Sequence, residues 1–379
     1  MGIFNVTNME WYRREALSPM QKNTSRETWI RHDGSEQAFP VKTFLGKKTN
    51  LLKLKKNVVE NITEQLTYFK RTRTEVYSQP DKTPVTSCPV CGTTSEEANY
   101  QVTIYEAKYV TCPHCTHAYV INRPSPNALH EFYLSDVNYA ATYTDKASAE
   151  SRLNAIAVPW RDWMVQLYQD LHGKPPQKIL DVGSGAGHFV EACRRSGMQA
   201  NGIELSESSR EFAKNIWGIE MDARDFTKVD QDYQRYDVIT FWGLLEHTPN
   251  PKDLLAAAQR IFADNPHAMI IAKLPRWHSL SGFIQNICND TIVRHLDPMG
   301  HISCYTDASA AELYYQSGFS PVAAWYYGMD VYELMMQISH HINQYNPLLE
   351  TGEIQMELQQ KLDEVKLSDG LTLVGTPRK

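Results

Sequence analysis

Four cysteines form two closely spaced pairs of a kind that suits a metal ion. The pairs are Cys88 with Cys91 and Cys112 with Cys115, in the pattern C-x2-C-x20-C-x2-C. Each pair can direct two thiolates at one ion from a single tight turn, and two such turns complete a tetrahedral zinc site without an open position. We therefore expect a structural zinc ribbon over residues 86–122, because this short segment has too little apolar content to fold alone.

A glycine-rich turn in the second half of the chain suits a bound cofactor. It follows a predicted strand at residues 178–182 and opens a predicted helix. Its fixed positions, in the spacing D-x-G-x-G-x-G, are Asp181, Gly183, Gly185 and Gly187. Glycines let the backbone approach a ligand closely, and the helix N-terminus offers free N–H groups. The dinucleotide fingerprint G-x-G-x-x-G/A does not fit, because His188 occupies its last position.

This turn resembles the first motif of the class I S-adenosylmethionine-dependent methyltransferases and matches it at every glycine. The resemblance implies that Glu204, at the end of the second strand, accepts hydrogen bonds from the ribose hydroxyls of S-adenosylmethionine. It also implies that Asp225 accepts from the adenine amino group and that Phe226 packs on the adenine ring, with Asp222 as the alternative to Asp225. Trp242, at the end of the fourth predicted strand, is implied to line the cofactor cleft.

The residues after that fourth strand suit proton transfer. Methyl transfer is an in-line displacement, so the protein positions the acceptor and, for an oxygen or carbon acceptor, removes its proton. The segment Leu-Glu246-His247-Thr-Pro-Asn-Pro resembles the LEH-x-P-x-P signature of a large methyltransferase subgroup. His247 is the candidate general base, because imidazole titrates near neutral pH; alternatively, it closes the pocket or caps the next helix. Glu246 would orient His247 or a substrate hydroxyl.

A second histidine, His301, lies in a segment that resembles another motif of the same subgroup. It is either a pocket residue or a residue that makes a structural hydrogen bond.

Strands and helices alternate around these residues. Short apolar strands are predicted at 199–205, 218–223, 236–242 and 268–274, with helical patterns between them and a last strand at 368–377. This alternation predicts a parallel sheet covered on both faces. With the resemblance, it implies an α/β, Rossmann-like, seven-stranded methyltransferase sheet with helices on both faces over residues 148–379. A Tyr-rich connector, residues 123–147, would join it to the ribbon.

The first 85 residues differ in charge from the remainder of the 379-residue chain. The net charge is −6, but residues 1–87 carry +6 and residues 88–379 carry −12. We expect a basic, helical extension over residues 1–85, with a hairpin turning at Asp33-Gly34 and an amphipathic helix over 51–69. Five lysines crowd the start of this helix, either as a patch that binds an anion or an acidic partner or as a solvated face: Lys47, Lys48, Lys53, Lys55 and Lys56.

The order of ribbon, connector and methyltransferase fold resembles bacterial enzymes that methylate sugars. Their carbon-methylating members carry a longer C-terminal domain, which favours oxygen or nitrogen transfer to a sugar or nucleotide-linked sugar here. The alternative is a nucleic-acid methyltransferase that binds RNA or DNA with the ribbon and the basic helix; the −12 charge and the lack of an NPPY motif argue against it. We expect a cytoplasmic protein without a membrane partner, because no apolar run is long enough to span a bilayer and no secretory leader is present.

Overall fold

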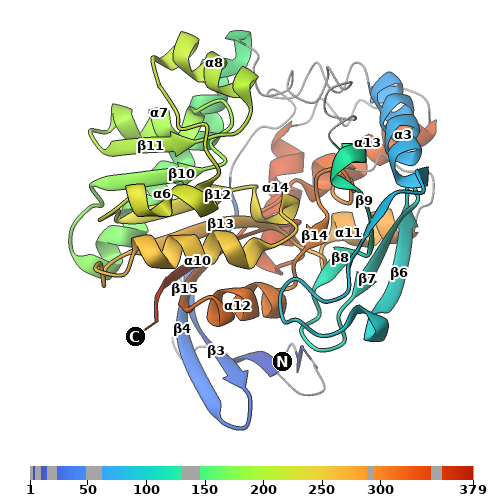
Figure 1. Cartoon of the computed structure of the whole chain (residues 1–379), viewed down its shortest axis with the longest axis horizontal. Helices are drawn as coiled ribbons and strands as arrows, with labels where there is room; N and C mark the ends of the chain where they lie inside the picture. Colours follow the sequence, from blue (N-terminus) through green and yellow to red (C-terminus); the bar gives the residue numbers. More distant parts are fainter. Residues whose placement is uncertain are drawn as a thin grey trace.

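The computed structural model of the chain describes residues 3–4, 10–14, 24–47, 62–129, 146–287, 294–342 and 352–378. Its centre is a sheet in the strand order β1-β2-β3-β4-β15-β16-β13-β12-β10-β11. The strands of its C-terminal part are β10 (Lys178–Val182), β11 (Gln199–Ile203), β12 (Val238–Trp242), β13 (Met269–Pro275), β15 (Phe319–Tyr326) and β16 (Gly370–Pro377). Strands β10 to β13 are parallel, whereas β16 runs antiparallel between β13 and β15 (Figure 1). The predicted Rossmann-like α/β class is confirmed.

The strand predicted at 218–223 is reduced to a single bridge. Asp222 pairs with Ile203 in parallel, through hydrogen bonds from Glu204 N–H to the Asp222 carbonyl and from Asp222 N–H to the Gly202 carbonyl. The chain then turns at once, because Asp225 caps the next helix. Within the described residues, the part of the central sheet formed by residues 148–379 therefore has six strands and a bridge where seven strands were expected.

Helices cover both faces of this sheet, as predicted. On one face lie α6 (Val158–His172), α7 (His188–Arg195) and α8 (Glu207–Trp217); on the other lie α10 (Pro251–Ile261) and α12 (Asp307–Gln316). The burial of alternating strand residues produces the two faces. Ile179 packs with the residues of α6 and α7, whereas its neighbour Leu180 packs with those of α10 and α12.

The predicted hairpin at the N-terminus is confirmed and is larger than expected. Strands β3 (Thr24–His32) and β4 (Glu36–Leu45) pair antiparallel, with Gly34 in a left-handed conformation at the turn. The sequence did not predict that β4 pairs in parallel with β15, which extends the central sheet. The short strands β1 (Ile3–Phe4) and β2 (Glu10–Arg14) continue that edge. The first 85 residues are therefore not only a helical extension.

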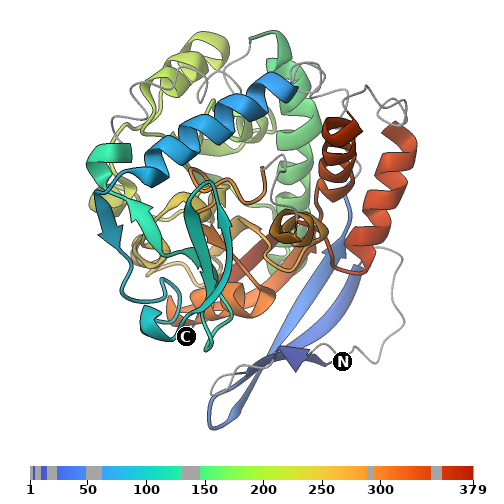
Figure 2. The same cartoon turned by 90° about the vertical axis from the view of Figure 1, so that its right-hand side faces the viewer.

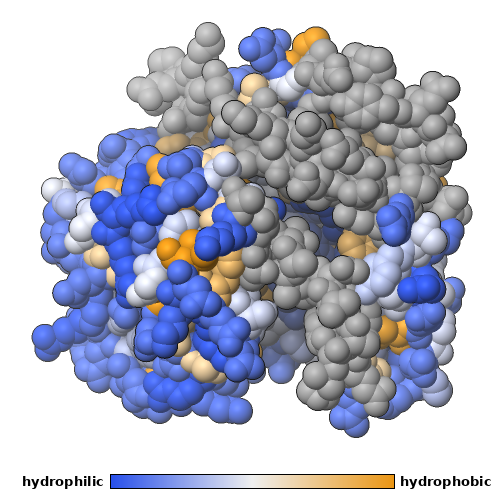
Figure 3. Space-filling model, turned by 90° about the horizontal axis from the view of Figure 1, so that it is seen from above, coloured by the Kyte–Doolittle hydropathy of each residue, from blue (hydrophilic) through white to orange (hydrophobic). Residues whose placement is uncertain are grey.

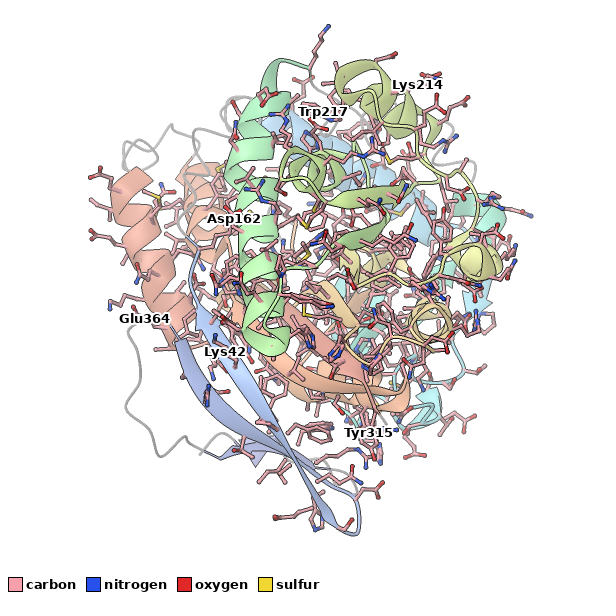
Figure 4. The ribbon with its side chains drawn as sticks, turned by 90° about the vertical axis from the view of Figure 1, so that its left-hand side faces the viewer. Lys42, Asp162, Lys214, Trp217, Tyr315 and Glu364 are labelled. Atoms are coloured by element: carbon pink, nitrogen blue, oxygen red, sulfur yellow. The ribbon has the colours of Figure 1, made fainter. Side chains whose placement is uncertain are left out.

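Side-chain contacts hold the hairpin to the body of the protein. The Arg31 guanidinium and the Trp11 indole N–H both donate to the fully buried Glu312 carboxylate of α12, at 3.0 and 3.1 Å. On the opposite face, Lys42 of β4 pairs with Asp170 at the end of α6 (Figure 4). The hairpin is an integral part of the sheet.

The predicted amphipathic helix is described as α3 (Ile62–Ser78), which runs nine residues further than the expected end at Phe69. The predicted start of the helix and four of its five lysines lie outside the described residues. Figure 2 shows α3 lying over the segment that carries the four cysteines, referred to below as the ribbon. Tyr77 packs in one hydrophobic cluster with Tyr109 of the ribbon, and Arg73 forms an ion pair with Asp297 at 3.2 Å.

The ribbon joins the C-terminal part of the chain through a shared sheet. The ribbon supplies three strands to this sheet: β6 (Asn99–Ile104), β7 (Ala107–Thr111) and β8 (Ala118–Val120). At its two ends, β5 (Lys82–Pro84) and β9 (Asn122–Pro124) pair with each other as a separate two-stranded sheet. Strand β14 (Ser303–Cys304) pairs with β8, so that the shared sheet has the order β14-β8-β7-β6. Most of the Tyr-rich connector lies outside the described residues.

The remaining helices are α11 (Leu280–Ile287), α13 (Asp330–Ile342) and α14 (Gly352–Glu364), with the shorter segments η1 (Ser95–Glu97), η2 (Lys146–Ser148), α5 (Ala149–Arg152) and η3 (Leu153–Ala157). Within the described part of the chain, no helix combines the length and the apolarity that a membrane crossing requires. Seen from above, the described surface is mostly hydrophilic, with small hydrophobic patches (Figure 3).

Candidate active site and metal centre

The glycine turn between β10 and α7 has the conformation that a close ligand approach requires. Gly183, Gly185 and Gly187 have φ angles of 72°, 52° and 76°, in the left-handed region that glycine adopts without strain. A Cβ on Gly183 would lie 3.1 Å from the Leu244 side chain, whereas a Cβ on Gly185 would meet no atom within 4 Å. Gly185 therefore faces open space at the carboxyl end of the parallel strands, where this kind of fold binds its ligands.

Asp181 lies beneath the turn. It is buried, and its carboxylate accepts a hydrogen bond from Thr240 Oγ1 of β12 at 2.6 Å. Burial raises the pKa of Asp181 to about 7; the Thr240 hydrogen bond opposes this rise, and the negative charge of Glu204 adds to it. Its backbone carbonyl accepts from Ser184 Oγ at 2.7 Å. In the described structure, Asp181 thus supports the turn from below.

Glu204, directly after β11, contacts the turn from the side. One carboxylate oxygen accepts from Gly185 N–H and the other from Ser206 N–H, each at 2.7 Å. Two residues that the sequence singled out separately are therefore adjacent. A carboxylate next to an open glycine turn can accept hydrogen bonds from a pair of hydroxyl groups, as the ribose of S-adenosylmethionine presents.

The residues predicted to contact adenine follow the single bridge. Asp225 caps α9 (Phe226–Val229) by accepting from the N–H and the hydroxyl of Thr227, at 3.0 and 2.8 Å. The Phe226 ring is buried, edge-on to Phe241 at 6.0 Å. Asp222 accepts from Arg224 and Tyr233, and the hydrogen bond from Arg224 lowers the pKa of Asp222 to about 2. Both aspartates lie near the second strand, and the choice between them stays a prediction.

Trp242, at the end of β12, has a partner that the sequence did not indicate. Its ring is stacked on that of Trp160 of α6, with centroids 4.3 Å apart and an angle of 9° between the planes. Phe189 of α7 packs edge-on against Trp242 at 5.1 Å. Trp160 follows Pro159 in α6, and no motif around it assigned it to a site.

Glu246, His247 and His301 meet beyond the end of β12. The first two lie in the short helical turn η5 (Leu245–His247). Glu246 is buried, its Oε2 has no hydrogen-bond partner within the described structure, and burial raises its pKa. His247 Nε2 lies 3.9 Å from Glu246 Oε1, and the rings of His247 and His301 are 5.7 Å apart. The structure thus brings together all three predicted catalytic residues.

The two histidines differ in their surroundings. His301 Nδ1 donates to the His295 carbonyl at 2.6 Å, which leaves Nε2 with its lone pair. Burial and then the charges of His247 and His295 hold the pKa of His301 well below its usual range. The side chain of His247 is about one-third exposed, at 33%. His301 is therefore a neutral hydrogen-bond acceptor, and His247 is the more exposed of the two.

The same three side chains offer two nitrogen ligands and one oxygen ligand within 4.8 Å of one another. That set suits a divalent transition metal as well as proton transfer.

The four predicted cysteines converge at a second site. Cys88 Sγ lies 3.5 Å from Cys115 Sγ, and Cys91 Sγ lies 3.4 Å from Cys112 Sγ. All four sulfur atoms lie within 4.8 Å of one another. In a tetrahedral zinc–thiolate site the sulfur atoms are about 3.8 Å apart, so these cysteines fit the ion.

Two equivalent turns hold these cysteines. Gly92 N–H donates to the Cys88 carbonyl at 2.9 Å, and Thr116 N–H donates to the Cys112 carbonyl at 3.0 Å. Gly92 and Thr116 both have positive φ, at 80° and 61°. Each C-x2-C pair therefore forms the tight turn that its spacing predicted.

The ribbon also supports the catalytic cluster. The Tyr109 hydroxyl, on β7, lies 2.9 Å from the His301 carbonyl and 3.0 Å from the Leu296 carbonyl and donates to them. His117 Nε2 lies 3.2 Å from Ser303 Oγ of β14. Spacing indicated a metal site here, but nothing in the sequence indicated that the ribbon would hold the segment carrying His301.

Comparison with known proteins agrees with this geometry. Residues 153–324 match the family model described as a methyltransferase domain. Over this range the chain is similar to a methyltransferase domain. The matched range includes every predicted cofactor and catalytic residue and excludes the four cysteines.

Curated relatives resemble part of this domain. A ubiquinone biosynthesis O-methyltransferase from Bordetella avium is 30% identical over 125 residues, which cover 31% of this chain and 50% of that protein. One from Coxiella burnetii is 37% identical over 82 residues, which cover 20% of this chain and 35% of that protein. The chain thus spans about half, or less, of the length of these relatives. Among solved structures, the plantazolicin methyltransferase BamL has 15% identity and a TM-score of 0.43, over 63% of this chain and 90% of that chain.

Proposed function

We propose that the protein transfers the methyl group of S-adenosylmethionine to a hydroxyl oxygen of a small molecule. The main observation is the position of Glu204 on the Gly185 turn, at the same edge of the sheet as Glu246 and His247. The relatives that resemble the domain are named O-methyltransferases, which supports oxygen as the acceptor atom. A sugar or nucleotide-linked sugar remains the proposed acceptor class.

S-Adenosylmethionine, when bound, supplies a methyl group already activated on a sulfonium. The chain's own residues then have two tasks. Glu204 and the Gly185 turn hold the cofactor, and the cluster after β12 takes the proton of the acceptor hydroxyl. The four cysteines hold zinc in a closed site away from this chemistry, so its role is structural.

His247 is the proposed general base, and Glu246 and His301 orient it. A base must hold the proton that it removes, and His301 is a poor choice because burial lowers its pKa strongly. His247 is reachable, and the Glu246 carboxylate 3.9 Å away stabilises the imidazolium that forms. The neutral His301 ring next to it can accept a hydrogen bond from His247 or from the acceptor hydroxyl.

The experiment that tests this function is a methyl-transfer assay with the full chain. Nucleotide sugars, simple sugar phosphates and catechols are incubated with S-adenosylmethionine, and the products are screened by mass spectrometry for a gain of about 14 mass units, one methyl replacing one hydrogen. We expect a product in at least one class, with NMR placing the methyl on oxygen. A methyl group found on carbon or nitrogen would overturn the assignment of the acceptor atom.

A further inference from the structure

Two lysines outside the predicted site point at the same pair of aromatic rings. Lys47 directly follows β4, and Lys273 lies near the end of β13. Lys47 Nζ lies 5.1 Å from the centroid of Trp160 and 5.4 Å from that of Tyr327. Lys273 Nζ lies 6.0 and 5.8 Å from the same two centroids. The two ammonium groups therefore share one aromatic surface.

Neither lysine has a counter-ion at contact distance within the described structure. No described residue forms a hydrogen bond or an ion pair with either Nζ. Asp369 and Glu246 interact electrostatically with Lys273 without contacting it. Burial, and then the positive charge of Lys273, lower the pKa of Lys47 to about 7. Both lysines are partly buried. Charges removed from water are normally paired, so two neighbouring ammonium groups without an anion in contact are an unusual arrangement.

The backbone fixes the position of Lys47. Gly46, the residue before it, donates its N–H to the Tyr326 carbonyl at 2.8 Å, and its own carbonyl accepts from the Trp325 indole at 2.9 Å. Lys47 is therefore held against β15 by the N-terminal hairpin. Through this contact, a residue of the N-terminal part of the chain lies beside the proposed active site. The composition of the N-terminal part did not indicate this position.

The lysine pair lies on one particular side of the proposed active site. Lys273 is the register partner of Trp242, and Trp242 is stacked on Trp160. At the carboxyl ends of the parallel strands, Glu204 follows β11, the glycine turn follows β10 and the candidate base follows β12. Lys273 lies on the next strand in the sheet, β13. The lysines thus lie on the far side of the candidate base from the cofactor residues, which is the side that remains for the acceptor.

We propose that Lys47 and Lys273 bind an anionic group of the methyl acceptor, a phosphate or a carboxylate, against the faces of Trp160 and Tyr327. This inference rests on the proposed function, because it assigns acceptor specificity at the same site. An anion between the two ammonium groups supplies the missing counter-charge and removes their mutual repulsion. The acceptor class it selects is a phosphorylated or carboxylated small molecule, which includes nucleotide-linked sugars.

The test measures anion binding to protein saturated with S-adenosylhomocysteine. Inorganic phosphate and benzoate are titrated separately by calorimetry into the wild type, Lys47→Met, Lys273→Met and a matched control, Lys178→Met. Lys178 Nζ also lies over an aromatic ring, 4.5 Å from the centroid of Tyr236. Lys178 is the first residue of β10, at the amino ends of the parallel strands and therefore away from the proposed site. We expect each of the two site variants to weaken binding of at least one anion tenfold or more, and the control to change it less than twofold. The anion that responds identifies the group as phosphate or carboxylate.

If the wild type binds neither anion, or if both site variants bind them as the wild type does, the inference is wrong. A loss of S-adenosylhomocysteine affinity in the lysine variants would also overturn it, because the pair would then bind the cofactor's carboxylate. Failure of the wild type to bind S-adenosylhomocysteine would instead contradict the proposed function. Lys47→Gln and Lys273→Gln repeat the test should a methionine variant fold poorly; a large loss of stability is unexpected, because neither ammonium group forms an ion pair within the described structure.

Discussion

The hydroxyl of Tyr109, on ribbon strand β7, donates to the backbone carbonyl of His301 at 2.9 Å. A residue of the cysteine-bearing ribbon thus holds a residue of the candidate catalytic cluster, although the two are far apart in the chain. Strand β14, which begins two residues after His301, completes the same connection by pairing with β8 of the ribbon. The ribbon therefore supports the segment that carries His301.

Removal of this support should affect both stability and rate. Tyr109→Phe leaves the Leu296 and His301 carbonyls without their shared donor, so we expect a loss of about 1–3 kcal/mol in the free energy of unfolding. We also expect a lower kcat with unchanged zinc content, because His301 loses its support while the cysteines do not. Chemical unfolding, methyl-transfer kinetics and metal analysis measure these effects. Tyr100→Phe is the control, since its hydroxyl contacts only Thr103 at an exposed position. Equal kcat in both variants would rule out a supporting role for Tyr109.

Loss of zinc should extend beyond the ribbon. Cys91→Ser, or a strong chelator, should release the ion, lower the thermal unfolding midpoint and reduce methyl transfer, because β8 and Tyr109 would lose their positions. Cys193→Ala is a suitable control, since Cys193 is buried in the core of the methyltransferase part. We expect that variant to retain its zinc. A zinc-free protein with full activity would show that the ribbon is dispensable for the site.

Stability should depend on pH through Asp181. Burial raises its pKa to about 7, so the folded state binds a proton that the unfolded chain releases near pH 4. Its contribution to stability is complete below about pH 4 and is lost as the pH rises through 7, with a slope of at most about 1.4 kcal/mol per pH unit. Asp181→Asn keeps an oxygen for Thr240 and removes the titration.

The Asp181→Asn variant should therefore gain stability relative to the wild type between pH 5 and pH 8, measured by denaturant unfolding. Asp162→Asn, on the exposed side of α6 (Figure 4), should show no such trend. Parallel stability profiles for the wild type and Asp181→Asn would show that Asp181 is ionised in the folded protein throughout this range.

Catalysis should depend on His247 more than on its neighbours. His247→Ala should lower kcat about 100-fold or more, with little change in affinity for S-adenosylhomocysteine, because it removes the base and leaves the cofactor residues intact. His301→Asn should have a smaller effect, since His301 is neutral and orients the site. His267→Ala, at an exposed position beside His172, serves as the control. If His247→Ala kept the wild-type kcat at every pH tested, the base would be another group.

The sequence predicted those parts of the site that depend on local structure. The turn from Gly183 to Gly187 needs residues without a side chain at positive φ, and the two C-x2-C pairs need two tight turns, so spacing alone indicated both. The contacts between distant segments were not predictable in the same way. Alternation of apolar residues shows that β4 has a buried face, but it does not show that β15 is the neighbour.

The same limit applies to the residues that sequence reasoning missed. Tyr109, Trp160 and Lys273 have no motif around them, and each obtains its proposed role from a partner on another element. Lys47 was noted only as one of five clustered lysines, and its position beside Lys273 depends on the hairpin joining the sheet. The expected third strand became a bridge because Asp225, three residues after Asp222, already caps α9.

The central claim, that the Gly185 turn and Glu204 hold S-adenosylmethionine, is tested most directly by calorimetric titration of S-adenosylhomocysteine. The account predicts one binding site in the wild type, a tenfold or greater loss of affinity in Glu204→Ala, and wild-type affinity in Glu357→Ala, which changes an exposed glutamate of α14. All three proteins should unfold cooperatively. A wild type that binds no S-adenosylhomocysteine, or a Glu204→Ala variant that binds it as tightly as the wild type, would contradict the account.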